Sequence, residues 1–221
     1  MLIDHVALEL LGNPVFLRAT GRIAMPLFAF LIGEGCRYTR NRTKYFLRIF
    51  TLGVFCQAVY TLALLLNGAL TSVCLNILLT FSVAILLYFA FIRFEEKKKY
   101  SLSVLIMTIV LVILFELFCQ KSKSIVGISI SYDYGIFGVI LPFVSAMFKD
   151  RRGRLTAFSA ALIVFVIFNA QSTWYYVFAL FALPIIFLYN GKRGNTRFKY
   201  TFYIFYPLHL AIIYIIKLLI S

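Results

Sequence analysis

An unbroken apolar run with a basic end occupies residues 73–99, VCLNILLTFSVAILLYFAFIRFEEKKK. Its first part, residues 73–92, contains no charged side chain. At 1.5 Å per residue, a helix of this length crosses the roughly 30 Å of hydrocarbon in a bilayer. The run therefore predicts a transmembrane helix, with Arg93 and the following lysines in the water beyond its end.

Similar runs recur on both sides of this one. Hydrophobic residues make up 62% of the 221 residues, charged residues only 14%, and the mean hydropathy is +0.94, which excludes a soluble globule of this length. No barrel-like alternation of apolar and polar residues is present, so helices are expected. We predict one all-α domain over residues 1–221, a polytopic transmembrane bundle of about eight or nine spans whose first span is truncated. The predicted spans are residues 1–12, 20–36, 45–66, 73–92, 101–119, 134–148, 155–170, 174–189 and 200–220.

The net charge of +14 comes from basic residues that gather in alternate loops, which is typical of an oriented membrane protein and argues against nucleic-acid binding. This distribution predicts a multi-pass protein of the cytoplasmic membrane with its N-terminus inside and its C-terminus outside. The four groups are Arg37, Arg40, Arg42, Lys44 and Arg48; Arg93, Lys97, Lys98 and Lys99; Lys149, Arg151, Arg152 and Arg154; and Lys192, Arg193, Arg197 and Lys199. The four cysteines lack metal-ligand spacing, so no metal site is expected.

Ionisable side chains within spans are candidates for function, because each costs at least a few kcal/mol in lipid. His5 follows Asp4 in the first span, and His209 lies in the last. An imidazole suits a general base or a transient acyl carrier, and a histidine that only bonds two helices together is the alternative. We expect Asp4, His5 and His209 to be catalytic.

Arg22 requires a partner inside its span, and Asp4 or Glu9 on the preceding helix are the candidates. Such a pair could orient the helices or hold a substrate oxyanion. Glu34 lies between two glycines at the end of the same span, and we expect it to form an ion pair with the basic loop that follows.

The last span contains residues 202–209, FYIFYPLH. Pro207 removes a backbone hydrogen bond and is expected to kink the helix beside Tyr203, Tyr206 and His209. This pattern favours a polar pocket over an aromatic belt at the membrane interface, and the tyrosine hydroxyls are candidates for binding substrate.

Basic residues of the loops, among them Arg40, Arg42, Lys192 and Arg193, could bind the phosphates of an acyl-CoA. Their role in setting the membrane orientation accounts for the same residues without a ligand.

The chain resembles the TraX family in motifs spread over its whole length. They are residues 21–35, GRIAMPLFAFLIGEG, with 39–42, TRNR; 3–5, IDH; Asn76; 133–135, DYG, with Gly138; 183–184, LP, with 189–194, YNGKRG, which includes Asn190; and 202–209. The resemblance implies a membrane acetylase like the one associated with acetylation of the pilin N-terminus, distantly similar to transmembrane acyltransferases in which a histidine on an early span is considered catalytic. His5 is the matching position. Glu34 and Asn190 are expected to be structural.

These observations together predict an acyltransferase that moves acetyl from acetyl-CoA to an amine or hydroxyl acceptor on a protein, glycan or lipid, without a bound cofactor. Arg22, Tyr203 and Tyr206 would stabilise the oxyanion or bind the substrate. A transporter or flippase, and a non-catalytic assembly protein, are the alternatives, because buried charges also line transport paths.

Overall fold

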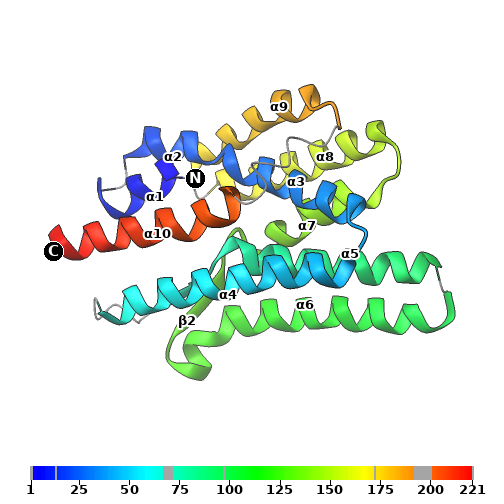
Figure 1. The fold of residues 1–221 in the computed structure, drawn as a ribbon, viewed down its shortest axis with the longest axis horizontal. Coiled ribbons are helices and arrows are strands. Elements are labelled where there is room, and N and C mark those ends of the chain that lie inside the picture. The colour runs from blue at the N-terminus through cyan, green and yellow to red at the C-terminus, as the bar shows by residue number, and fades with distance from the viewer. Residues whose placement is uncertain are drawn as a thin grey trace.

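The computed structural model describes residues 2–12, 14–66, 72–96, 98–171, 173–191 and 201–220, and nearly all of them are helical (Figure 1). The elements are α1 (Leu2–Glu9), α2 (Val15–Gly21), α3 (Ala24–Tyr38), α4 (Arg42–Leu66), β1 (Ser72–Leu75), α5 (Ile77–Glu96), α6 (Lys98–Val126), β2 (Ser129–Tyr132), α7 (Gly135–Met147), α8 (Arg151–Ala170), the 3₁₀ helix η1 (Trp174–Phe181), α9 (Ala182–Leu188) and α10 (Thr201–Ile220).

The prediction of an all-α membrane bundle is confirmed. Five described segments are long and apolar enough to cross a bilayer, and three further helices are apolar but shorter. The long segments are Val15–Tyr38, Arg42–Leu66, Ile77–Glu96, Leu105–Ile125 and Arg151–Ala170, and the shorter ones are Gly135–Met147, Trp174–Leu188 and Tyr203–Lys217. The chain is therefore an integral membrane protein.

The span expected at residues 174–189 consists of two helices, η1 and α9. Pro184 lies in the first turn of α9, where it cannot donate a backbone hydrogen bond to the carbonyl of Leu180. The 3₁₀ helix η1 ends at Phe181 and α9 begins at Ala182, so the α-helical hydrogen bond that Pro184 cannot form falls at the junction of the two helices. The structure thus has an apolar helical segment at the predicted place, Trp174–Leu188, whose helix type changes at Ala182.

The helices form two groups joined through α7. Figure 1 shows α4, α5 and α6 together in the lower half and α3, α8 and α9 in the upper half. Helix α5 packs against α4, α6 and α7, and α7 packs against α3 and α8. The terminal helices α1 and α10 contact each other, and α10 also packs on α4. Large apolar side chains such as Phe81, Phe158 and Phe165 fill the interior.

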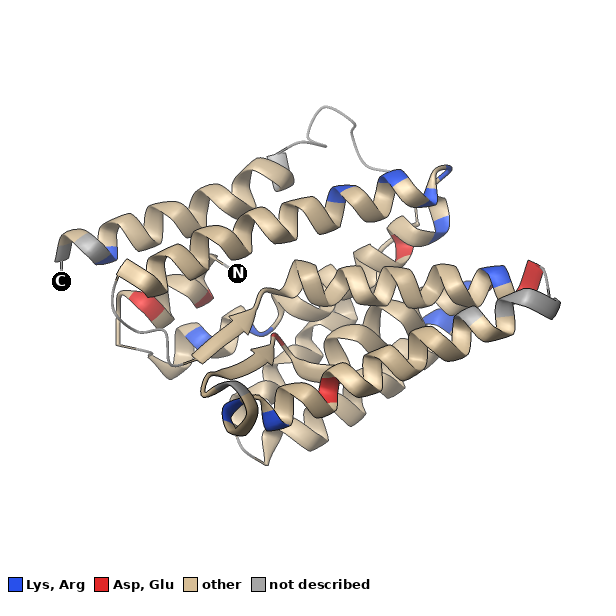
Figure 2. Cartoon of the chain, turned by 90° about the horizontal axis from the view of Figure 1, so that it is seen from below, with Lys and Arg blue, Asp and Glu red and all other residues tan. Residues whose placement is uncertain are grey.

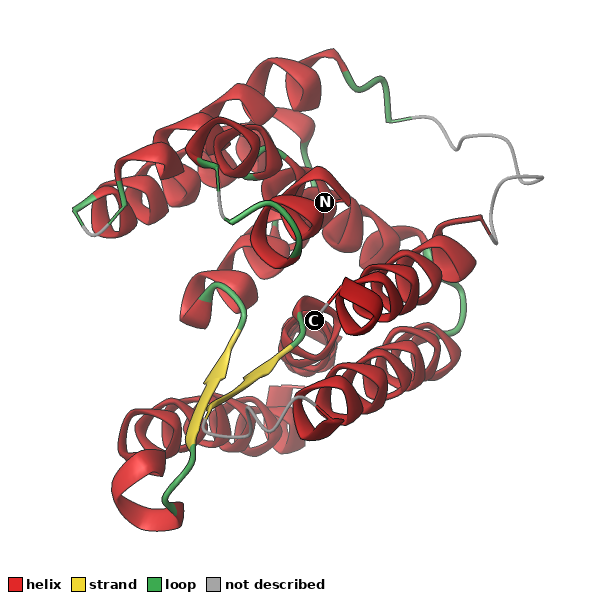
Figure 3. Cartoon of the chain, turned by 90° about the vertical axis from the view of Figure 1, so that its left-hand side faces the viewer, coloured by secondary structure: helices red, strands yellow, loops and turns green. Residues whose placement is uncertain are grey.

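A parallel two-stranded ribbon interrupts the helices. Ser72 of β1 pairs with Ser129 of β2, and the register continues to Leu75 and Tyr132 (Figure 3). Residues 73–76 were expected to be helical, but α5 begins only at Ile77. Asn76 ends the strand, because its side-chain oxygen accepts hydrogen bonds from the backbone N–H groups that open the helix.

The connections from α3 to α4, α5 to α6 and α7 to α8 lie at one end of the bundle (Figure 1). Figure 2 shows that many Lys and Arg residues gather at this end, as the alternate-loop pattern predicted. The fourth basic loop lies outside the described residues. Helices α3 and α4 meet at this basic end, so the beginning of α3 and the second half of α4 lie toward the opposite end.

Candidate functional site

A cavity of about 330 Å³ lies between α1, the start of α3, the second half of α4, η1 and α10. Its wall includes Asp4, His5, Arg22 and Tyr206, which the sequence analysis selected as site residues. It also includes Asp133, directly after β2. The volume is at the lower end of the range for small-molecule sites. Residues from both ends of the chain therefore meet in one polar cavity.

Asp4 forms an ion pair with Arg18, with 2.6 Å between the carboxylate Oδ1 and the guanidinium Nη1. Both side chains are largely buried. Gly21 lies beneath this pair, because a Cβ atom there would come within 2.5 Å of the Asp4 Cβ. The small residue lets α1 approach α2 closely enough for the ion pair to form.

Arg22 was expected to pair with Asp4 or Glu9, and this prediction is wrong. Arg18, one turn before Arg22, forms an ion pair with Asp4. Lys217 forms an ion pair with Glu9, with 2.6 Å between Nζ and Oε2. The spacing of four residues puts Arg18 and Arg22 on one helix face, so either could have reached the carboxylate.

The guanidinium of Arg22 is held by aromatic side chains instead. It donates a hydrogen bond of 2.9 Å to the Tyr134 hydroxyl. It also lies 5.5 Å from the ring centres of Tyr134 and Tyr175 and 4.7 Å from that of Tyr176. Cation–π contacts of this kind stabilise a buried guanidinium without neutralising it. Arg22 is only 6% exposed, so its guanidinium is held in the cavity wall, which also contains the carboxyl groups of Asp4, Glu9 and Asp133.

His5 and His209 lie against each other, with 5.5 Å between their ring centres. His209 is 4% exposed, and its Nδ1 lies 2.8 Å from the carbonyl oxygen of Phe205. Because a carbonyl only accepts hydrogen bonds, Nδ1 carries the proton in the neutral form of this imidazole, and Nε2 then has a lone pair. Nε2 is buried and has no hydrogen-bond partner among the described residues. A proton acceptor therefore lies beside His5.

Asp133 is a cavity residue for which the sequence analysis predicted no role, although it belongs to one of the family motifs. It lies between β2 and α7, outside the spanning helices. Its burial in the cavity wall raises the pKa of the carboxyl group to about 7, and nearby Arg22 opposes part of this rise. Asp133 can therefore exchange a proton near neutral pH. Only the tertiary fold reveals this, because in sequence the residue belongs to an inter-span loop.

The two candidate tyrosines of α10 lie in different places. Tyr206 is 8% exposed and lines the cavity. Tyr203 lies one turn closer to the basic end, where its ring is 5.7 Å from the guanidinium of Arg48. Helix α10 continues through Pro207. The structure thus brings Tyr206, but not Tyr203, into the cavity.

The basic residues proposed for CoA binding lie away from the cavity or outside the described residues. Arg40 is exposed, and Arg42 forms an exposed ion pair with Glu96 with a distance of 2.7 Å. Lys192 and Arg193 lie outside the described residues. Asn190, expected to be structural, is exposed after the end of α9.

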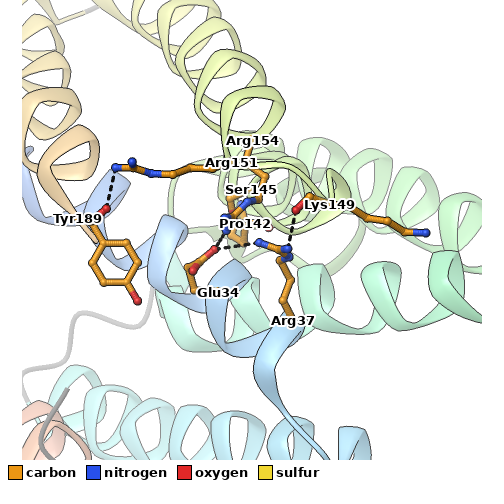
Figure 4. Close-up of polar contacts among 8 residues, drawn as sticks. All are labelled: Glu34, Arg37, Pro142, Ser145, Lys149, Arg151, Arg154 and Tyr189. Carbon is orange, nitrogen blue, oxygen red and sulfur yellow. Dashed lines mark hydrogen bonds and ion pairs between the residues drawn. The ribbon is translucent and has the colours of Figure 1, made fainter. Parts of the chain in front are cut away.

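Glu34 is the centre of a second buried polar cluster, near the basic end (Figure 4). It forms ion pairs with Arg37, at 3.5 Å, and with Arg154 of α8. The first contact confirms the expected pairing with the basic stretch that follows, and the second was not expected. Arg37 also donates to the carbonyl of Lys149, so the cluster joins α3 to the α7–α8 connection and to α8.

The chain is similar to a known family and to a described relative. A protein from Dichelobacter nodosus described as "Probable fimbrial assembly protein FimC, serogroup H1" is 27% identical over 231 residues, covering 96% of this chain and 89% of the relative. No solved structure is significantly similar to the chain. The family described as TraX protein matches residues 1–217. With nearly its entire length matched, the chain belongs to the TraX family.

Proposed function

We propose that this protein is a membrane-embedded acyltransferase that transfers an acetyl group from acetyl-CoA to an amine or hydroxyl acceptor. The observation that carries the proposal is the imidazole of His5 in the wall of a polar cavity that also contains a guanidinium, with a second imidazole, that of His209, packed against His5. A base and an oxyanion-stabilising group on one cavity are what acyl transfer requires.

In the proposed reaction, the acceptor nitrogen or oxygen attacks the thioester carbonyl carbon while His5 takes the acceptor's proton. The carbon–sulfur bond then breaks, and His5 returns the proton to the departing CoA sulfur. Arg22, bonded to Tyr134, is the group that would stabilise the oxyanion between these steps. His209, with its free Nε2, would accept a proton from His5 or stabilise it. Asp4 would orient this site through its ion pair with Arg18.

The cavity is too small for the nucleotide part of CoA, so only the thioester end would enter it. If the basic end is cytoplasmic, as the positive-inside rule indicates, the cavity lies toward the outer half of the membrane. The acceptor would then approach from outside. The description of the Dichelobacter relative makes a fimbrial subunit the first acceptor to test.

The test follows acetyl transfer from labelled acetyl-CoA in purified protein, without a transmembrane gradient. His5→Ala should abolish transfer. Tyr206→Phe, which alters the cavity, should reduce transfer, whereas Tyr203→Phe on the same helix should leave it unchanged. Wild-type turnover by His5→Ala rejects the assignment.

The relative's description also supports a non-catalytic assembly role as a second candidate. That role predicts no turnover by the wild-type protein. It also predicts full biological function in a triple Ala variant of Asp4, His5 and His209. A transporter would require a gradient or a substrate flux and would consume no acetyl-CoA.

A further inference from the structure

A second and larger cavity of about 640 Å³ lies between α4, α5 and α6. Its wall is almost entirely hydrocarbon and includes Phe46 and Phe50 of α4, Leu79 and Val83 of α5 and Val112 of α6. All three helices contain predicted membrane spans. The proposed acyl transfer assigns nothing to this space.

The cavity opens toward the bilayer. Its rim includes Phe50, Leu86 and Leu111, which are 39%, 45% and 57% exposed. Helix α6 continues this surface with other exposed apolar side chains, such as Ile113 at 50%. An apolar space at this depth excludes water, and leaving it empty would forfeit dispersion contacts along its whole wall. Hydrocarbon from the surrounding lipid is the occupant with matching chemistry.

One wall residue provides a polar contact. Thr80 is 3% exposed, and its hydroxyl is buried without a hydrogen-bond partner among the described residues. A buried hydroxyl without a partner costs free energy. The ester carbonyl of a phospholipid can accept this hydrogen bond, whereas a plain alkane cannot.

The β1–β2 ribbon separates this cavity from the polar one. Leu75 contributes to both walls, Tyr132 lines the apolar cavity, and the next residue, Asp133, lines the polar cavity. Successive residues of an extended chain point to opposite sides, which explains this division. An occupant of the apolar cavity would therefore contact the face of the ribbon opposite the polar cavity.

We propose that the apolar cavity binds one acyl chain of a membrane phospholipid, with the Thr80 hydroxyl donating a hydrogen bond to an ester carbonyl of that lipid. The bound chain would hold the ribbon in place and with it the wall that contains Asp133. The proposal does not depend on the acyltransferase activity, because lipid binding is measured without acetyl-CoA.

The experiment uses full-length protein reconstituted in phosphatidylcholine vesicles with a trace of phosphatidylcholine bearing a photoreactive group in its acyl chain. After irradiation, the adducts are located by mass spectrometry of peptides. We expect adducts on the wall residues of α5 and α6. Lipid retained after purification in detergent is counted in parallel, and about one molecule per protein is expected.

Val112→Trp fills the cavity, and we expect it to lower both wall adducts and retained lipid at least about fivefold. Ile113→Trp is the matched control, because its side chain is exposed and lies outside the cavity wall, and it should leave both unchanged. Thr80→Val keeps the shape but loses the hydroxyl, so it should lower retention several-fold. Adducts spread evenly along α6, together with wild-type retention in Val112→Trp and Thr80→Val, overturn the proposal.

Discussion

Replacing Glu34 by Gln should destabilise the protein far more than replacing Glu96 by Gln. Both carboxylates form interhelical ion pairs with arginine, Glu34 with Arg154 and Glu96 with Arg42. They differ in burial. The side chains of Glu34 and Arg154 are 5% and 9% exposed, whereas those of Glu96 and Arg42 are 53% and 41% exposed.

The expected magnitudes follow from this contrast. Removing one partner of a buried ion pair leaves a charge without compensation and costs roughly 3–5 kcal/mol. Breaking a solvent-exposed pair costs about 0–1 kcal/mol. Arg37 remains near Arg154 in Glu34→Gln and adds no compensation, because it has the same charge. The difference between the two variants should therefore be at least about 2 kcal/mol.

The assay is equilibrium unfolding in mixed micelles, followed through the fluorescence of Trp174, the chain's single tryptophan. A double variant, Glu34→Gln with Arg154→Met, should recover most of the loss, because it removes the most deeply buried charge, while Arg37 is 19% exposed and keeps its hydrogen bond to the Lys149 carbonyl. Equal free energies of unfolding for Glu34→Gln and Glu96→Gln would refute the reasoning.

Three further predictions concern the polar cavity. Arg22→Lys keeps the charge but loses the planar contact with Tyr134, so acetyl transfer should fall about 10²-fold, and a wild-type rate would contradict the oxyanion role. Gly21→Ala puts a Cβ against Asp4 and should lower the free energy of unfolding by about 1–3 kcal/mol, a loss that thermal unfolding would detect. The pKa of Asp133 is raised to about 7, so its folded-state proton contributes stability at low pH that is lost as the pH rises through 7. Asp133→Asn should therefore gain stability relative to wild type as the pH rises from about 4 to about 7, and a stability difference that does not change with pH would argue against a buried carboxyl group.

Hydropathy predicted the bundle well, because the length of an apolar run directly reflects the thickness of the bilayer. It could not find β1, since residues 72–75 continue the apolar run of α5 without a break in composition. Only pairing with Ser129–Tyr132, far along the chain, makes this segment a strand. The composition of residues 72–75 therefore does not predict that they pair with a second strand.

The rarity of ionisable residues in spans pointed to His5, Arg22 and His209, and the structure places these residues at or beside one cavity. The choice of ion-pair partners could not be predicted. Arg18 and Arg22 share a helix face, and only the close approach of α1 at Gly21 decides that Arg18 meets Asp4. Asp133 was not predicted as a site residue, because this loop residue becomes buried only when β1 pairs with β2.

The pairing of β1 with β2 has a consequence for biogenesis. The two strands are separated by the whole α5–α6 hairpin, so Leu75 finds Tyr132 only after both of these helices have been inserted. Asp133 and Tyr134 follow immediately, so the polar cavity closes late in synthesis. A nascent chain that stops before residue 129 can contain α2 to α6 as inserted helices and still lack the parts of the polar cavity wall that come from Asp133, η1 and α10.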